Sequence, residues 1–263
     1  MSLRCLPAFL VCLMPAIAGA GAWPAPEGGG QTIVTNTRKA DSTEGIIGQE
    51  TEDVRTEVTL FGEYGLTRDT TLGLVISGGF SAIDEEDVEL RLGGHVRHTF
   101  WRGEDGDVAS VELGASFPAE RWIGFGLGDN KPESVSEAYV NLQYGRGWQF
   151  DWLDVFVSTG IEFRARGEQQ DEELRLFSTA GIRPFDRLMA LTEARFHQPL
   201  GQRGEPQFKL SPSLAYTMLP WLGSNDKKPE LDRIPITIQL GVTWDAWNPD
   251  DGIALNLSVW RPF

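Results

Sequence analysis

The sequence has almost no cysteine and few histidines, and both scarcities narrow the chemistry open to it. Its only cysteines, Cys5 and Cys12, lie close to the N-terminus, so a chain that loses this segment has no disulfide or thiolate chemistry. The residues before Cys12, Phe9-Leu10-Val11, lack the small residue that a lipid-attachment motif needs, which argues against a lipoprotein. The histidines show no His-x-His or His-Glu-x-x-His spacing, so the sequence predicts no metal and no cofactor.

Basic residues are also in short supply. The chain has 23 Lys and Arg against 38 Asp and Glu, a formal net charge of −15. A surface of that sign repels phosphates, which excludes nucleic acid as a partner.

A long apolar helix is missing as well. The run from Leu6 to Ile17 follows Arg4 and ends in the small residues Ala18-Gly19-Ala20, a pattern too short for a membrane-spanning helix and typical of a secretory signal peptide. We predict a signal peptide over residues 1–22, cleaved after Ala20 or Ala22, and one domain over 23–263. Loss of Arg4 changes the charge balance to 22 − 38 = −16.

A period of two is the dominant pattern of the remaining chain. Residues 87–101, DVELRLGGHVRHTFW, alternate a mostly apolar face with a mostly polar one. This predicts an extended strand with one oily and one charged face. The oily face packs into the core in a soluble sandwich, whereas in a membrane barrel it meets lipid and the charges look inward.

The same alternation predicts about twelve strands, with little sign of a second domain. Their expected ranges are 31–40, 54–66, 70–80, 88–101, 108–117, 134–144, 152–164, 173–183, 188–196, 206–216, 234–245 and 253–263. Most have about ten residues or more, which suits a tilted strand crossing a bilayer better than a soluble strand. The connections tend to alternate between short and long, as in outer-membrane barrels. We therefore predict an all-β, antiparallel, up-and-down transmembrane barrel, with a secreted sandwich as the alternative.

The C-terminus carries a family resemblance. The end IALNLSVWRPF places Ile253, Leu255, Leu257 and Val259 on one face before the terminal Phe263, although Arg261 and Pro262 depart from the alternation. This resembles the closing strand of Gram-negative outer-membrane β-barrel proteins. The resemblance implies recognition by the barrel-assembly machinery, contact with outer-membrane lipid and lipopolysaccharide, and a location in the outer membrane after secretion. An even number of strands would put both termini in the periplasm.

Aromatic residues near strand ends suggest girdles at the two membrane interfaces. They are Trp101, Trp148, Trp152, Phe185, Trp244 and Trp260.

The inward faces are expected to carry charges of both signs. The candidates for residues that line the lumen and select solutes there are Glu89, Arg91, His95, Arg97, Glu112, Glu137, Glu162, Arg175, Glu193 and Arg195. These charges could form a selective constriction, or a network that only satisfies a polar interior. Because the belt is nearly balanced and the outer loops are acidic, we expect a narrow channel with a mild preference for cations.

Two other kinds of site are open. His95 or His197 could serve a Ser-His-carboxylate hydrolase with Ser110, Ser116 or Ser158, although no nucleophile motif selects one. Acidic clusters at 84–87, 171–173 and 250–251 are expected in or beside outer loops, as solvated loop ends or as ligands for divalent cations.

The sequence is therefore interpreted as a monomeric barrel that acts as a passive channel or transporter for small solutes. An outer-membrane lipid-modifying enzyme, or a structural or adhesive barrel, is the alternative. Residues 217–232, TMLPWLGSNDKKPELD, are expected to form an exposed periplasmic loop that contacts a partner, with an inserted plug or a miscounted strand as the alternatives.

Overall fold

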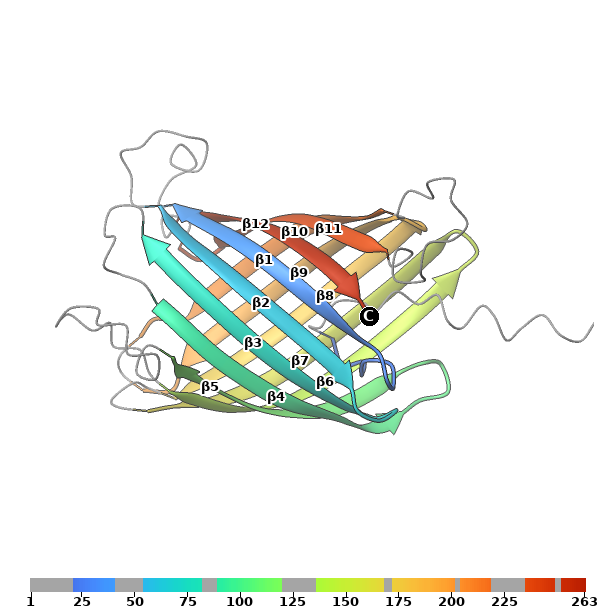
Figure 1. The fold of residues 1–263 in the computed structure, drawn as a ribbon, viewed down its shortest axis with the longest axis horizontal. Coiled ribbons are helices and arrows are strands. Elements are labelled where there is room, and N and C mark those ends of the chain that lie inside the picture. Colours follow the sequence, from blue (N-terminus) through green and yellow to red (C-terminus); the bar gives the residue numbers. More distant parts are fainter. Residues whose placement is uncertain are drawn as a thin grey trace, which may run out of the picture.

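The computed structural model describes residues 21–40, 54–81, 89–119, 136–167, 172–201, 204–218, 235–248 and 252–263. These residues form twelve antiparallel strands in a closed barrel, in which each strand pairs with its neighbours along the chain and β12 pairs with β1 (Figure 1). The strands are β1 (Gly30–Ala40), β2 (Arg55–Gly65), β3 (Thr70–Ser81), β4 (Glu89–Arg102), β5 (Val108–Pro118), β6 (Glu137–Phe150), β7 (Leu153–Arg166), β8 (Glu173–Phe185), β9 (Leu188–Pro199), β10 (Gln207–Met218), β11 (Ile236–Asp245) and β12 (Ile253–Pro262). The predicted barrel and its strand number are confirmed.

The barrel has two different ends. The terminus end, at the right of Figure 1, holds the start of β1, the end of β12 and the short turns after β2, β4, β6 and β8. The loop end, at the left, holds the ends of β1, β3, β5, β7, β9 and β11. No helix in the described residues is long and apolar enough to span a membrane.

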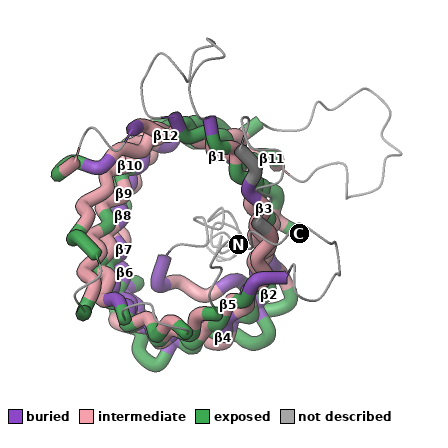
Figure 2. Tube along the Cα trace, turned by 90° about the vertical axis from the view of Figure 1, so that its left-hand side faces the viewer, coloured by how far each residue is buried: buried purple, intermediate pink, exposed green. Residues whose placement is uncertain are grey.

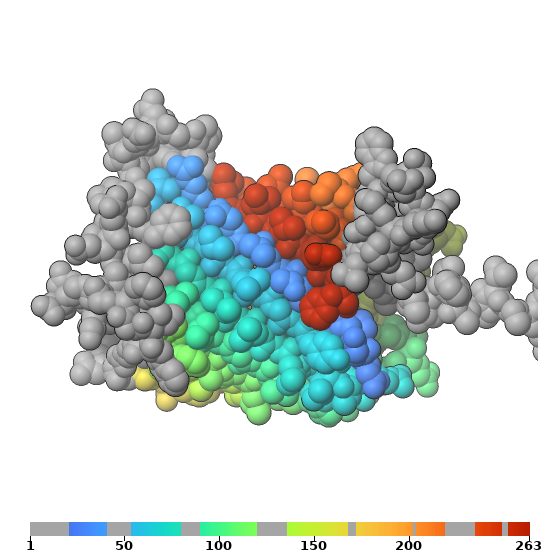
Figure 3. All heavy atoms as spheres, in the orientation of Figure 1, coloured from blue at the N-terminus to red at the C-terminus, as the bar shows by residue number. Residues whose placement is uncertain are grey.

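The seam between the first and last strands closes the wall. Ten residue pairs run from Gln31 opposite Pro262 to Ala40 opposite Ile253. Gly30 and Phe263 extend this pairing, because each backbone N–H donates to the other residue's carbonyl at 3.0 Å. On the face shown in Figure 3, the last strand (red) lies directly against the first (blue) in a continuous outer wall. Closure leaves no strand edge exposed along the seam.

The outer wall is apolar, as the alternation predicts. Its exposed side chains include Leu74, Leu113, Leu142 and Leu240, which are 54%, 59%, 51% and 62% exposed. In β4, Val96 and Phe100 are exposed whereas His95 and Arg97 are buried. Exposed large apolar residues all around a closed barrel form a surface suited to lipid.

Most strand ends differ from the prediction by a few residues, and two differences are larger. Strand β6 runs to Phe150 rather than 144, because its pairing with β7 continues through the glycines at 145 and 147 as far as Phe150 opposite Leu153. Trp260 was expected in an interface girdle, but it is 7% exposed and packs inside the barrel with Phe156, Met189, Leu191 and Ala215. It lies between Val259 and Arg261, and the alternation of β12 turns it inward.

Candidate functional site

The barrel interior is the candidate site, and its wall divides into two chemically different halves. One half carries carboxylates, guanidinium groups and histidines, most of them on β4 to β8. We call it the ionic wall. It consists of Glu63, Arg91, His95, Arg97, Glu112, Glu137, Glu162, Arg164, Arg166, Glu173, Arg175 and His197.

The ionic wall begins with a buried cluster around Arg97. This side chain is 1% exposed, and its guanidinium donates to Glu63 Oε1 at 2.6 Å and Glu112 Oε2 at 3.5 Å. His95 Nε2 lies between the same two carboxylates, 3.5 Å from Glu63 Oε1 and 3.9 Å from Glu112 Oε2. The Tyr139 hydroxyl donates to Glu112 Oε1 at 3.1 Å. Each charge therefore has opposite charge beside it, which buried charges require.

A second cluster continues along β6, β7 and β8 toward the loop end. Glu137 binds Arg164 and lies 3.2 Å from Arg166 Nε. Glu173 accepts hydrogen bonds from Arg166 and Arg175, each at 2.6 Å. This series of ion pairs continues to Arg91 and Glu162 at one side and to His197 at the other. There, His197 Nδ1 lies 3.0 Å from Glu173 Oε1. Arginine and glutamate alternate here, so the wall neutralises most of its own charge.

An inner segment, residues 21–29, lies against this wall near the terminus end. Figure 2 looks into the ring of strands and shows this part of the chain inside it. Ala22 N donates to Ser158 Oγ of β7 at 3.3 Å, and Ala25 N donates to Thr71 Oγ1 of β3 at 2.9 Å. Thr71 is opposite Arg97 in the register. The inner segment thus spans the wall from β7 to β3 and helps to exclude water from the Arg97 cluster.

Glycines on the inner face make room for rings. A Cβ on Gly145 would lie 2.8 Å from the Trp23 indole, which meets Phe156 edge to face with centroids 6.3 Å apart. A Cβ on Gly73 would lie 1.9 Å from the His95 ring. These two positions need glycine because a neighbouring side chain already fills the space above them.

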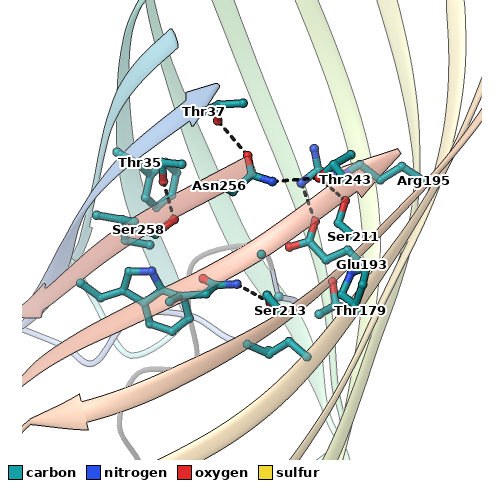
Figure 4. Close-up of a pocket in the computed structure, with 18 of the residues that line it drawn as sticks. Thr35, Thr37, Thr179, Glu193, Arg195, Ser211, Ser213, Thr243, Asn256 and Ser258 are labelled. Carbon is teal, nitrogen blue, oxygen red and sulfur yellow. Dashed lines mark hydrogen bonds and ion pairs between the residues drawn. The ribbon is translucent and has the colours of Figure 1, made fainter. Parts of the chain in front are cut away.

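The other half of the wall borders a cavity of about 410 Å³. Its hydroxyl and amide groups, on β1 and β10 to β12, form what we call the hydroxyl wall. Its members are Thr35, Thr37, Ser211, Ser213, Gln239, Thr243, Asn256 and Ser258. Figure 4 labels all of them except Gln239 and shows the labelled side chains around the cavity, beside the ion pair of Glu193 and Arg195 on the neighbouring strand β9.

Hydrogen bonds join the hydroxyl wall across four strands. Thr37 donates to Asn256 Oδ1 at 2.9 Å, and Asn256 Nδ2 donates to Thr243 Oγ1 at 2.9 Å. The Thr243 hydroxyl is in turn 2.8 Å from the Ser211 hydroxyl. These groups keep further donor and acceptor capacity toward the cavity, since a hydroxyl both donates and accepts.

An apolar floor lies at the terminus end of the cavity. Phe156, Met189, Leu191, Ala215 and Trp260 form a buried cluster, and Trp23 and Ile33 pack against it. Because Trp23 belongs to the inner segment, the floor joins this segment to β7, β9, β10 and β12. The cavity is therefore polar along one side and apolar at one end.

The predicted lumen residues are distributed over both halves. Arg91, His95, Arg97, Glu112, Glu137, Glu162 and Arg175 lie in the ionic wall, whereas Glu193 and Arg195 line the cavity. Glu89 begins β4, and its side chain is outside the described part of the structure. A role for these residues in selecting solutes stays a prediction.

Several charged residues that were not among the lumen candidates also belong to the interior, including Arg164, Arg166 and His197 of the ionic wall. Glu63 anchors Arg97 and was visible as an inward position of its strand. Lys209 lines the cavity. Glu173 was expected at the start of a strand, in an acidic cluster in or beside an outer loop; it is the first residue of β8, is 5% exposed and turns inward onto Arg166 and Arg175. The clusters at 84–87 and 250–251 lie outside the described residues.

Within the described residues, His95 and His197 contact carboxylates rather than a serine of the hydrolase considered from sequence. No group of three or more potential metal ligands occurs within the described ranges. In the same part of the chain, no serine hydroxyl is hydrogen-bonded to His95 or His197, whose charged neighbours are Glu63 and Glu112 for one and Glu173 for the other. Of the segment 217–232, Thr217 and Met218 belong to β10, and the remaining residues are outside the description.

Comparisons with known proteins bear on the fold. No protein-family model matches the sequence, and no curated protein matches it. Among solved structures, the KdgM porin in complex with disordered oligogalacturonate aligns with a TM-score of 0.53 and 11% identity, over 88% of this chain and 99% of the porin. The chain has the fold of an outer-membrane β-barrel protein. LpxR from Salmonella typhimurium aligns with a TM-score of 0.52 and 9% identity, over 88% of this barrel and 99% of LpxR. At such identities the likeness concerns the fold alone.

Proposed function

We propose that this barrel is a passive channel for small polar solutes in the outer membrane of a Gram-negative bacterium. The observation that carries the proposal is the cavity of about 410 Å³ inside the barrel, bordered by hydroxyl and amide groups from four neighbouring strands. Such groups replace the water that a polar solute leaves behind when it enters a narrow space. The apolar outer wall supports the membrane location.

The arrangement of the two walls supports passive transport. The ionic wall is held together by its own ion pairs and so offers a rigid side to the lumen. The hydroxyl wall offers weak, repeated hydrogen-bonding sites, which suit passage because binding must remain weak enough for release. The proposal also includes a monomeric barrel with its terminus end in the periplasm, lipopolysaccharide as its outer-leaflet neighbour, and assembly guided by Phe263.

Conductance of the purified barrel in planar bilayers tests the channel. We expect discrete openings for the native chain and a lower conductance for Asn256→Trp, whose indole would occupy the cavity. The matched control is Leu257→Trp, one residue away on the outer face and 44% exposed. Folding of all three proteins is checked by their heat-dependent migration on gels. An absence of openings in the folded native barrel, or equal loss in both variants, would contradict the proposal.

A further inference from the structure

Two like charges face each other across β9 and β10 inside the cavity. Arg195 and Lys209 are directly opposite in the register, and both line the cavity. Directly opposed like charges destabilise a strand pair, so this arrangement is costly unless something offsets it. Arg195 is offset by Glu193, whose Oε2 lies 2.6 Å from its guanidinium. Lys209 has no carboxylate within 4.0 Å in the described part of the chain.

More basic than acidic residues surround Lys209. It interacts electrostatically with Lys39, Arg175 and Arg195, and with one acid, Asp245. Asp245 is opposite Lys209 across β10 and β11, but no oxygen of its carboxylate lies within 4.0 Å of the ammonium. Its Oδ1 accepts the backbone N–H groups of Trp247 at 2.9 Å and Asn248 at 3.1 Å. The charged residues that line the cavity are Glu193, Arg195 and Lys209, so the lining has one positive charge in excess, in a chain whose overall charge is −15.

The ionic wall shows that the fold can neutralise cations where it needs to. There, Arg97, Arg164, Arg166 and Arg175 each contact at least two carboxylates. An ammonium left without such a partner, at the border of an interior cavity, is available for an anion that enters from solution.

We infer that the cavity binds small organic anions, with a carboxylate between Lys209 and Arg195 and hydroxyl groups along the hydroxyl wall. The inference rests on the proposed channel function and names its solute class. Ser211 and Ser213 follow Lys209 at successive inward positions of β10, spaced about 7 Å apart along the strand. A hydroxylated carbon chain that extends from a carboxylate at Lys209 meets these hydroxyls in turn. A volume of about 410 Å³ suits a solute of that size.

This inference reverses the preference for cations expected from the sequence. That expectation treated the interior charges as one balanced belt. In the structure the charges balance within the ionic wall, where they form ion pairs with one another. The cavity is lined by the ion pair of Glu193 and Arg195 and, in addition, by the positive charge of Lys209.

Gluconate and sorbitol are the matched probes, because they share a hydroxylated six-carbon chain and differ by a carboxylate. Reversal potentials in a gradient of potassium gluconate give the permeability of gluconate relative to potassium. We expect Lys209→Gln to lower this ratio about sixfold, because removal of a unit charge about 8 Å from the ion path in water weakens the entry of gluconate and favours that of potassium by about 2.4-fold each. Arg187→Gln, at the exposed turn between β8 and β9, removes the same charge away from the cavity and should leave the ratio unchanged. Sorbitol uptake in liposome swelling should be equal in all three proteins.

A binding measurement separates this inference from the channel function. Acetylation of Lys209 in the detergent-solubilised native barrel, followed by mass spectrometry, should be slowed by gluconate and not by sorbitol. Protection without conductance would overturn the channel and leave the anion site in place. Conductance with an unchanged ratio in Lys209→Gln, or with no protection by gluconate, would overturn the anion site and leave the channel in place.

Discussion

Replacement of Arg97 by Met should destabilise the barrel strongly, because the change leaves two carboxylates without their main partner. Arg97 is 1% exposed, and Glu63 and Glu112 are 2% and 10% exposed at their side chains. Breaking a buried pair by removing one partner costs about 3–5 kcal/mol, since the remaining charge has neither water nor a counter-charge. His95, at 3.5 Å from Glu63, offsets only part of this cost.

The same barrel provides a control with the same chemistry and a different burial. Arg195 contacts Glu193 at 2.6 Å, the distance that also separates Arg97 from Glu63, but its side chain is 53% exposed. An exposed ion pair contributes about 0.2–1 kcal/mol, so Arg195→Met should cost no more than that. The free energy of unfolding is measured by urea titration in lipid vesicles, followed by tryptophan fluorescence.

A rescue variant tests the cause. Replacing Glu63 and Glu112 by Gln alongside Arg97→Met removes the stranded charges and should recover more than half of the lost stability. Equal losses for Arg97→Met and Arg195→Met would refute the argument that burial sets the strength of these pairs. Failure of the triple variant to recover would show that lost packing, rather than unpaired charge, causes the effect.

Three further changes test the assignment of faces and the interior packing. Leu92→Arg on the outer face should cost about 2–4 kcal/mol of folding free energy in lipid vesicles, and equal tolerance of Arg91→Leu and Leu92→Arg would contradict the assigned faces. Gly73→Ala should cost about 1–3 kcal/mol, because its new Cβ meets a histidine ring, whereas Gly62→Ala, with nothing within 4 Å, should be nearly neutral in the same assay. Trp23→Ala should raise single-channel conductance by opening the cavity floor, and an unchanged value would place the inner segment outside the conducting path.

The fold could be predicted from sequence because the alternation of apolar and polar residues, with a period of two, is the main requirement on a strand of a membrane barrel. Once Val96 and Arg97 are assigned to opposite faces, the phase of the whole strand follows, and the same holds for each strand in turn. Strand ends were less accurate where glycine interrupts the pattern, as at the end of β6. There the pairing with β7 determines where β6 ends, and this pairing cannot be read from the alternation within β6 alone.

The interior could be predicted only in part, since the alternation along a strand shows which side chains point inward but not which of them contact one another. Alternation places Glu63, Arg97 and Glu112 inward, but their contact depends on the stagger of β2, β4 and β5 around the barrel. The inner segment lacks any periodic pattern, so its position against β3 and β7 was not visible in the sequence. Trp260 was assigned by its position near a strand end, although its phase in β12 indicated the interior.

The inner segment also sets an order of events during folding. Its backbone donors reach Thr71 on β3 and Ser158 on β7, so its docking site consists of strands that are distant in the sequence. No single hairpin contains both acceptors, and an early intermediate that lacks β7 has nowhere to hold Ala22. Ala22 and Ala25 can therefore make both hydrogen bonds only after β3 and β7 have taken their places in the wall.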